Sequence, residues 1–467
     1  MFCPQQLVTQ AGRFVFSGEV RAVAHPCLHK EIIGEFWHNF SARSATLCLT
    51  PCDAFVFTVG NVKPLPLGEC AYSIYIGEDG ICVCAEGEQA LLHGFMALLD
   101  RIKVIDTDDG IACALDGAQI RERALIQNRM VHFCVFPETE LWELQHFLRF
   151  CGALRYTHVV LEFWGMLRYD CLAELSWQHA FEKEQIAPIL REARDLGLEI
   201  IPMFNHWGHA SAARVGYGKH VVLDQNPALQ TYFSEDGWCW DIRKPKARQL
   251  LRCIREELIA LCGEGSYFHI GCDEAFNFEL NRENMDLLCD FINEIAQDLA
   301  AQGRRAIAWG DMLLYPHAHY NPQNKYTCNA PSPEAEQYML QRLDRRIVIA
   351  DWQYDAPKAP VETAAVFTQA GFDCLLCPWD RGPQEMQAVI STVKSQALFG
   401  VLHTTWHTLS KGTPYAAAAA KGAFEDIGGY DSPAMRTASA ALWRRVMPCE
   451  GVYERAGWSR IQIWPRC

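Results

Sequence analysis

The sequence of 467 residues predicts an α/β protein, a (β/α)₈ TIM barrel preceded by a small α+β N-terminal domain. After about residue 120, apolar runs of about five residues alternate with amphipathic helical stretches, as in a parallel sheet with crossover helices. Eight such runs follow one another, and no Gly-rich phosphate loop of an open doubly wound sheet follows any of them. We therefore predict the small domain over residues 1–120 and the catalytic barrel, with a C-terminal helical tail, over 121–467.

The N-terminal residues are strand-like, since short alternating runs are separated by Gly, Pro and Asp. Two β-runs within 71–85 flank a Glu-Asp-Gly turn, and an amphipathic helix is expected to begin near Glu88. This combination predicts the α+β character of the small domain.

The eight expected barrel strands end in side chains that can do chemistry. An active site is expected at these carboxyl ends, because the loops there build the sites of such barrels. The strands are expected at 130–136, 157–163, 198–204, 266–271, 304–309, 346–352, 372–378 and 400–406.

Composition excludes several classes of partner. The chain has 42 Lys and Arg against 56 Asp and Glu, a net charge of −14, so we expect neither nucleic acid nor an anionic membrane as partner. No apolar run is long enough to span a bilayer, and the first residues do not have the pattern of a secretory signal. The 21 scattered cysteines favour a reducing, cytoplasmic compartment. The oligomeric state is left open.

Asp273 and Glu274 follow the fourth expected strand directly. Adjacent carboxylates at a strand end are uncommon, because like charges repel and shift each other's pKa. Such a pair can also cap the next helix or face solvent, and position alone does not decide between these readings.

Tryptophans end the later strands. A single Trp usually packs in the core, but successive ones at the same end of a barrel can stack on the C–H faces of sugar rings. Together with the carboxylates they suggest a sugar site. They are Trp309, Trp352, Trp379 and Trp406, with Trp164 after the second strand.

Two pairs of residues have spacings that occur in metal or redox sites. His206 and His209 have a spacing that could begin a zinc site, but we find no third ligand at metal spacing. Cys374 and Cys377 lie in an apolar strand with no second pair, so buried thiols are expected. We predict no metal and no cofactor.

The fourth-strand motif, His269-Ile-Gly271-Cys-Asp273-Glu274, resembles the signature of glycoside hydrolase family 20, the β-N-acetylhexosaminidases. The third-strand end, with Gly208-His209-Ala210, is similar to that family's second motif. The resemblance implies a retaining mechanism without an enzyme nucleophile, in which the substrate's 2-acetamido oxygen attacks the anomeric carbon and gives an oxazolinium ion.

By this resemblance Glu274 is the general acid and then the general base, and Asp273 holds the acetamido N–H and stabilises the positive charge. His209 and His269 are implied to orient the acid. Arg129, at the start of the first strand, is implied to hold ring hydroxyls. The substrate is implied to be an oligosaccharide or glycoconjugate with a terminal β-linked GlcNAc or GalNAc.

Some positions depart from the family pattern. Asn205 replaces an Asp of the third-strand motif, and Glu162 begins the segment where the family often has Asp-Asp. The family's tyrosine for the acetamido oxygen is not evident near the seventh strand. Tyr354 and Tyr315 are loop alternatives.

The family's sugar-reading acid after the eighth strand is also absent. Asp380 follows Trp379 and is the candidate match for an Asp of the family, but the family's Trp-x-Glu after the eighth strand reads Trp406-His407-Thr408 here. His407 and Arg381 donate hydrogen bonds, so we hypothesise tolerance of GalNAc or a 6-substituted sugar such as a 6-sulfate.

Two other functions remain alternatives to the hexosaminidase. A non-catalytic carbohydrate-binding barrel would keep the tryptophans but would not need both Asp273 and Glu274. A metal-dependent barrel hydrolase would need His206 and His209 to converge with a carboxylate.

Overall fold

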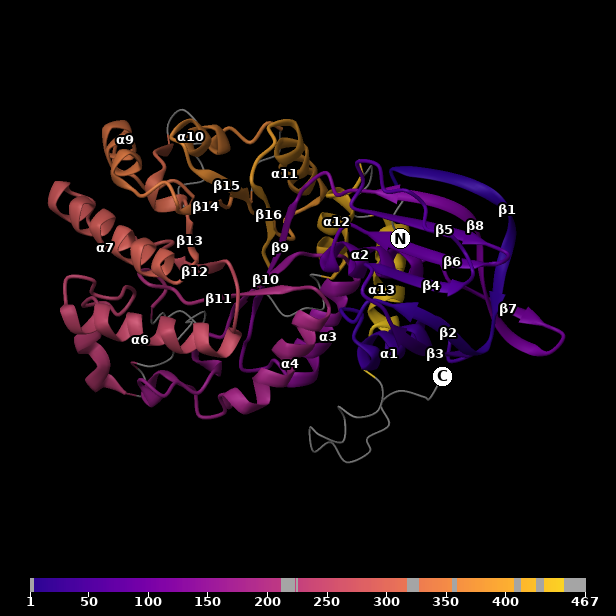
Figure 1. Cartoon of the computed structure of the whole chain (residues 1–467). Helices are drawn as coiled ribbons and strands as arrows, with labels where there is room; N and C mark the ends of the chain where they lie inside the picture. Colours follow the sequence, from indigo (N-terminus) through magenta and orange to yellow (C-terminus); the bar gives the residue numbers. More distant parts are fainter. Residues whose placement is uncertain are drawn as a thin grey trace.

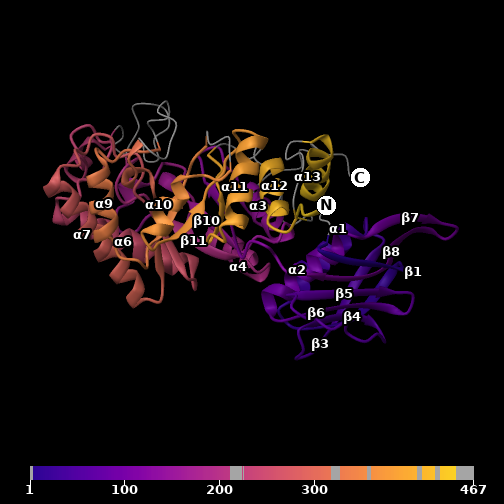
Figure 2. The ribbon, with the colours of Figure 1, turned by 90° about the horizontal axis from the view of Figure 1, so that it is seen from above.

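In the computed structural model, residues 4–210, 223, 226–316, 327–354, 359–406, 413–425 and 432–448 are described. A twisted sheet with two helices forms the N-terminal part, and a closed barrel with its surrounding helices forms the rest (Figure 1). The predicted fold class is therefore confirmed. Seen from above, the sheet lies beside the barrel at one end of the molecule (Figure 2).

The N-terminal part is an eight-stranded, mostly antiparallel sheet in the order β1-β8-β5-β6-β4-β2-β3, with β7 paired to β8. Its helices are α1 (Lys30–Phe40) and α2 (Glu88–Leu99). Its strands are β1 (Gln6–Phe16), β2 (Gly18–Ala24), β3 (Ala45–Pro51), β4 (Val56–Gly60), β5 (Tyr72–Gly77), β6 (Gly80–Ala85), β7 (Lys103–Thr107) and β8 (Gly110–Glu122).

The expected hairpin and helix of this domain are present. β5 and β6 pair through to Gly77 and Gly80, and α2 begins at Glu88. Phe95 of α2 packs on the sheet, with its ring 5.0 Å from that of Phe57 in β4, and lies 6.4 Å from the ring of Trp37 in α1. These aromatic contacts form the core of the domain.

The barrel closes in the order β9-β10-β11-β12-β13-β14-β15-β16, with β16 pairing in parallel with β9. All eight strands coincide with the apolar runs expected from the sequence. They are β9 (Asn128–Cys134), β10 (His158–Glu162), β11 (Glu199–Met203), β12 (Tyr267–Gly271), β13 (Arg305–Trp309), β14 (Val348–Asp351), β15 (Asp373–Leu376) and β16 (Gly400–His403).

Helices surround the barrel, and short 3₁₀ turns lie in its loops. The helices are α3 (Leu141–Ala153), α4 (Lys183–Asp195), α6 (Pro245–Cys262), α7 (Arg282–Ala301), α9 (Pro333–Arg342), α10 (Thr363–Gln369), α11 (Pro383–Ser395), α12 (Thr413–Gly422) and α13 (Pro433–Arg445). The 3₁₀ turns are η1 (Trp164–Met166), η2 (Ala173–Leu175), η4 (Pro227–Tyr232) and η5 (Asp311–Leu313).

Buried ion pairs join the two parts. Arg149 of α3 bonds to Glu35 of α1 at 2.8 Å and also to Glu192 of α4. Arg155, fully buried before β10, pairs with Glu122 at the end of β8. Because breaking such a pair leaves a buried charge uncompensated, these contacts fix the sheet against the barrel.

Strand alternation decides which side chains fill the barrel. The inward-facing residues form a separate buried cluster, and those between them pack outward against the helices. This alternation decides which residues can reach the carboxyl-end site. The inward cluster is Met130, Val160, Ile201, Met203, Ile307, Trp309, Val348, Ala350, Leu375, Cys377 and Leu402.

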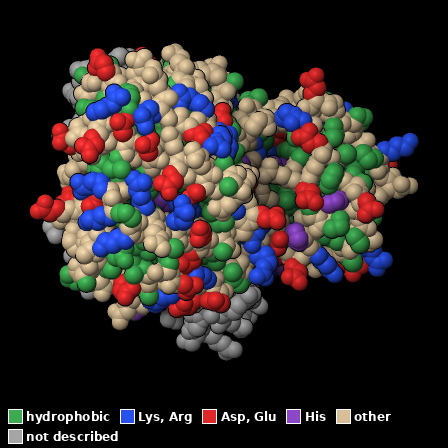
Figure 3. Space-filling view, turned by 60° about the vertical axis from the view of Figure 1, so that its left-hand side comes forward, with side chains coloured by type: hydrophobic (Ala, Val, Ile, Leu, Met, Phe, Trp, Pro, Cys, Tyr) green, Lys and Arg blue, Asp and Glu red, His purple; other side chains and the backbone are tan. Residues whose placement is uncertain are grey.

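Charged side chains lie mostly at the surface, and many of the cysteines are buried. Acidic and basic side chains are interspersed on the face drawn in Figure 3. The eighteen cysteines among the described residues are all free, and burial raises the pKa of Cys374 and of Cys377. Over the described part of the chain, no helix is both long and apolar enough to cross a bilayer.

Candidate active site

Asp273, Glu274 and His209 meet at the carboxyl ends of β11 and β12. His209 Nε2 lies 2.6 Å from Glu274 Oε2 and 3.6 Å from Asp273 Oδ2. The Asp273 side chain is 8% exposed and that of Glu274 20%, so the pair lies below the surface but can be reached. One imidazole therefore orients two carboxyl groups with different access to solvent.

Two glycines let the loops after β11 and β12 approach closely enough for this contact. A Cβ on Gly208 would lie 1.8 Å from the Asp273 carbonyl oxygen, and one on Gly271 would lie 1.6 Å from Asn205 Oδ1. Asn205 Oδ1 accepts a hydrogen bond of 2.8 Å from the Cys272 N–H. The amide that replaces the family's Asp thus holds the backbone just before the carboxylates.

The backbone itself is strained here. His209, Cys272 and Glu274 have φ values of +53°, +75° and +50°, a region that side chains other than Gly rarely adopt. Such strain persists where the surrounding contacts determine it, and it is common at functional sites. The unusual backbone turns the side chains of the two motifs toward each other.

A third carboxyl group, Asp311 of η5, supports the pair, and the sequence analysis missed it. Its Oδ2 accepts hydrogen bonds from the Glu274 N–H at 2.9 Å and from Asn329 Nδ2 at 3.1 Å, and its Oδ1 accepts one from Trp352 Nε1 at 3.2 Å. Burial, and then the negative charges of Asp273 and Glu274, raise the pKa of Asp311 well above its ordinary value. Its place two residues after Trp309 was the available signal.

Trp238 is a second residue that the sequence analysis missed. Its Nε1–H donates to the Glu274 carbonyl at 2.6 Å, and its ring lies 4.6 Å from the His209 ring. It comes from the loop between β11 and α6, so no strand pattern could indicate it. Trp238 therefore contacts both the backbone of Glu274 and the histidine beside it.

Three of the expected tryptophans gather around Tyr354, in the loop after β14. The Tyr354 ring lies 5.1 Å from those of Trp352 and Trp379, and its hydroxyl accepts a 2.6 Å hydrogen bond from Trp406 Nε1. Thr404 Oγ1 lies 3.1 Å from the same hydroxyl. The aromatic cluster of Tyr354, Trp352, Trp379 and Trp406, named the aromatic wall below, is therefore organised by a tyrosine.

Trp309 links the aromatic wall to the histidines of the barrel interior. Its ring is buried, 4.4 Å from His269 and 5.7 Å from Trp406. His269 Nδ1 accepts a 3.1 Å hydrogen bond from the Gly271 N–H, so His269 also stabilises the turn that precedes Asp273.

The remaining loop residues are placed as follows. Asp380 is partly exposed beside Trp379, and the Arg381 guanidinium lies 4.5 Å from the Trp379 ring centre. Tyr315 bonds through its backbone N–H to Glu336 and is not among the residues of the aromatic wall. His407 lies outside the described residues.

Arg129 is not brought to this site, which corrects the role implied for it. It is the second residue of β9 and faces outward, where it donates to the carbonyls of Arg155, Ile126 and Gln127 at 2.9–3.0 Å. Its other nitrogen lies 3.4 Å from His93 of α2. The alternation of β9 turns Arg129 away from the axis, so it holds the barrel's amino end against the small domain.

His206 and His209 do not converge. His206 is fully buried, with Nδ1 2.6 Å from the Phe204 carbonyl and Nε2 3.1 Å from Arg255. Burial, with the Arg255 charge, lowers the pKa of His206 to about 3. The two-histidine site that a metal-dependent hydrolase would need is therefore not formed by this pair.

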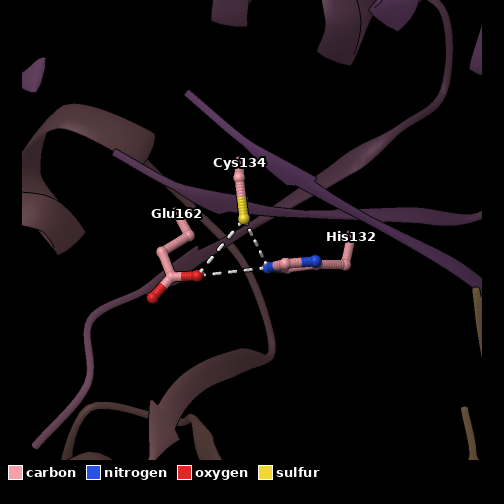
Figure 4. Close-up of side chains that lie close together, drawn as sticks. All are labelled: His132, Cys134 and Glu162. Carbon is pink, nitrogen blue, oxygen red and sulfur yellow. Dashed lines mark hydrogen bonds and ion pairs between the residues drawn. The ribbon is translucent and has the colours of Figure 1, made fainter. Parts of the chain in front are cut away.

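Two groups of His, Cys, Asp or Glu among the described residues are close enough to hold a metal ion. One is the His209–Asp273–Glu274 group. The other is formed by His132, Cys134 and Glu162 at the ends of β9 and β10 (Figure 4). Both groups lie at the carboxyl end of the barrel.

The sequence was compared with models of known protein families and with curated proteins. The model of the glycosyl hydrolase family 20 catalytic domain matches residues 158–461, which is more than half of the chain. A lacto-N-biosidase of Bifidobacterium bifidum is 18% identical over 274 residues. That match covers 55% of this chain and 24% of the relative, so the chain spans about a quarter of its length.

Solved structures share the fold over nearly the whole chain. A family 20 exo-β-N-acetylglucosaminidase of Vibrio harveyi, solved with N-acetylglucosamine, aligns with a TM-score of 0.68 and 14% identity, covering 95% of this chain and 77% of that one. A β-N-acetylhexosaminidase of Bacteroides fragilis aligns with a TM-score of 0.65 and 14% identity, covering 98% and 95%. The family-model match confirms the resemblance stated from the sequence, and the solved structures share the fold: this chain belongs to glycosyl hydrolase family 20.

Proposed function

We propose that the protein is a retaining exo-β-N-acetylhexosaminidase, which removes terminal β-linked GlcNAc or GalNAc with the substrate's acetamido oxygen as the nucleophile. The observation that carries the proposal is the pairing of a buried Asp273 with a more exposed Glu274 across one histidine. Two neighbouring carboxyl groups in different surroundings can perform different roles at the same pH.

Asp273 is suited to the acetamido group. Its Oδ1 is buried and accepts no hydrogen bond from a described residue. Asp273 Oδ1 could therefore accept a hydrogen bond from the substrate's acetamido N–H. This bond would hold the acetamido group in place while its carbonyl oxygen attacks C1. The carboxylate also stabilises the positive charge of the oxazolinium ion, and its buried position strengthens this interaction.

Glu274 is suited to move the proton. Its side chain is reachable from solvent, and His209, Trp238 and the Asp311 carboxylate fix its oxygen, carbonyl and N–H respectively. As the C1–O bond breaks, Glu274 would give its proton to the departing glycosidic oxygen. It would then take a proton from the water that opens the oxazolinium ion and releases the β-sugar.

The aromatic wall supports the choice of a sugar. Indole rings offer apolar faces for the C–H side of a pyranose, while the Tyr354 hydroxyl can donate a hydrogen bond. We assign Tyr354 as the hydroxyl that holds the acetamido oxygen, since it contacts three of the tryptophans.

The sugar preference remains a proposal from the sequence. The imidazole of His407, next to Trp406 in the sequence, and the guanidinium of Arg381 beside Trp379 can both donate hydrogen bonds. Tolerance of GalNAc or of a 6-sulfated sugar is therefore expected. If His407→Glu changes the ratio of the kcat/KM values for these sugars, the preference is supported, and an unchanged ratio would contradict it.

The eighteen free cysteines of the described chain also support our proposal that the protein works in a reducing compartment.

A panel of nitrophenyl glycosides tests the proposed function. We expect cleavage of β-GlcNAc and β-GalNAc and little or no cleavage of β-glucose or α-GlcNAc. The Glu274→Gln variant, purified in the same way, is the control for contaminating host enzymes. Equal or faster cleavage of the β-glucoside would contradict the proposal.

A further inference from the structure

We propose that His132, Cys134 and Glu162 form a binding site for a transition-metal ion, preferentially Zn²⁺, beside the aromatic wall. The three side chains point toward a common centre from two neighbouring strands (Figure 4). The hydrolysis proposed above gives these residues no role.

The strand register brings the three ligands together. Cys134 of β9 pairs directly with Glu162 of β10, and His132 is two residues before Cys134 on the same inward face. The Thr405 hydroxyl donates to the His132 carbonyl at 2.6 Å, and the Trp406 ring lies 4.5 Å from the His132 ring. The group is therefore held by two paired strands and not by a loop.

The distances fit an ion. His132 Nε2 lies 3.4 Å from Glu162 Oε2, and Cys134 Sγ lies 3.5 Å from each of these atoms. A point equidistant from three atoms so spaced lies about 2.0 Å from each of them, close to zinc bond lengths of about 2.0–2.3 Å. Tetrahedral angles with those bond lengths separate N and O by about 3.4 Å and sulfur from either by about 3.5 Å.

The catalytic group provides an internal contrast. His209 Nε2 and Glu274 Oε2 are 2.6 Å apart, which is the length of a hydrogen bond and too short for two ligands of one tetrahedral ion. The distance of 3.4 Å between His132 Nε2 and Glu162 Oε2 is longer than an ordinary hydrogen bond between N and O.

The chemistry of the ligands selects the ion. A thiolate and an imidazole favour Zn²⁺ or Co²⁺ over Mg²⁺ and Ca²⁺, which prefer oxygen ligands. The three side chains are at most 2% exposed, and a divalent cation would compensate a buried thiolate and a buried carboxylate. Binding would release the Cys134 thiol proton to solvent, and the fourth tetrahedral position would fall to water or a sugar hydroxyl.

Cobalt titration tests the site without measuring hydrolysis. Chelator-treated protein is titrated with Co²⁺, and we expect the near-ultraviolet thiolate-to-cobalt absorption to saturate at about one equivalent and to disappear when Zn²⁺ is added. Because the His209–Asp273–Glu274 group contains no sulfur, this absorption reports only a cysteine-containing site. No thiolate absorption in folded wild-type protein would overturn the proposal.

Variants locate the ion. Cys134→Ser should lose the absorption, and Glu162→Gln should weaken Co²⁺ binding by about 100-fold. Cys374→Ala, at a buried cysteine of β15, and Glu274→Gln should both bind as wild type does. Absorption that persists in Cys134→Ser, or that is lost in Cys374→Ala, would place the ion elsewhere and overturn the proposal.

A thermal readout covers the case in which Cys134→Ser does not fold. Zn²⁺ should raise the unfolding temperature of wild type and of Cys374→Ala, and should raise that of Glu162→Gln much less. An equal rise in all three proteins would contradict the site. Both readouts are independent of whether the protein cleaves hexosaminides.

Discussion

Two neighbouring edges of the barrel mouth differ in how they use the same kinds of side chain. At the β11–β13 edge, a hydrogen bond of 2.6 Å joins His209 to Glu274, and Asp273 lies 3.6 Å from the same histidine. Asp311 accepts a hydrogen bond from the Glu274 N–H. At the β9–β10 edge, the members of the His132–Cys134–Glu162 group are 3.4–3.5 Å apart. The 2.6 Å contact between His209 and Glu274 is suited to proton transfer, and the three even spacings around Cys134 are suited to an ion. The two groups therefore differ both in this closest contact and in the presence of a thiol.

The largest expected effect is at Glu274, and it would establish that the β11–β13 edge performs the chemistry. We expect Glu274→Gln to lower kcat by about 10²–10⁴-fold, the usual range for loss of a general acid and base. Glycosides with good leaving groups should be affected less, because they need little protonation. A rate near that of wild type in the folded variant would remove Glu274 from the mechanism.

Asp273→Asn should follow, with a loss of kcat of about 10²–10³-fold and little change in KM. Its charge is needed most when the oxazolinium ion forms, so ground-state binding should be largely retained. Steady-state kinetics measure kcat and KM, and a thermal melt measures the stability of the variant. If the melting temperature falls sharply, Asp273 has mainly a structural role.

Asp311→Asn should change both the pH dependence of stability and the rate of hydrolysis. The folded-state pKa of Asp311 is raised, so wild-type stability falls as pH rises above the unfolded value and through the folded one. The variant has no such carboxyl group, and its melting temperature relative to wild type should therefore rise with pH. Its kcat should fall by about tenfold, because the Glu274 N–H loses part of its support.

Asp351→Asn is the matched control for Asp311→Asn. Burial raises the pKa of Asp351 to about 6, so wild-type stability should also fall between about pH 4 and pH 6 and then become constant. Asp351 bonds to Thr363 and Gln353 and not to the catalytic carboxylates, so kcat should be unchanged. Equal losses of kcat in the two variants would deny Asp311 a specific role.

The smallest effect on activity is expected at Arg129. Arg129→Met should leave KM within about twofold of wild type, while the free energy of unfolding falls by about 2–4 kcal/mol because three carbonyls, two of them buried, lose their donor. Denaturant unfolding and kinetics on β-GlcNAc measure these outcomes. A KM raised tenfold or more with unchanged stability would restore the sugar-binding role.

The sequence predicted the parts of the molecule that depend on local pattern. Strand-length apolar runs predicted all eight barrel strands, and the motif around Asp273 and Glu274 predicted the family that the comparisons confirm. Trp238 could not be found this way, and the place of Asp311 after Trp309 did not show its role, because both roles arise from loops that meet only in the folded chain.

Arg129 shows a different limit. The resemblance placed Arg129 at the start of the first barrel strand. A shift of one residue along a strand reverses the face to which a side chain points, so this placement could not show that Arg129 faces outward. The same alternation turned His132 and Glu162 inward, and only the register of β9 with β10 shows that Cys134 lies opposite Glu162.

Fluorination of the substrate's N-acyl group tests the central claim, substrate-assisted hydrolysis, most directly. Electron withdrawal makes the acyl oxygen a weaker nucleophile, so kcat/KM for nitrophenyl β-GlcNAc analogues should fall steadily from acetyl through fluoroacetyl and difluoroacetyl to trifluoroacetyl. The full series should span about two orders of magnitude or more, because the attacking oxygen carries charge in the transition state. A kcat/KM that does not change across the series would show that the acetamido oxygen is not the nucleophile and would contradict the account.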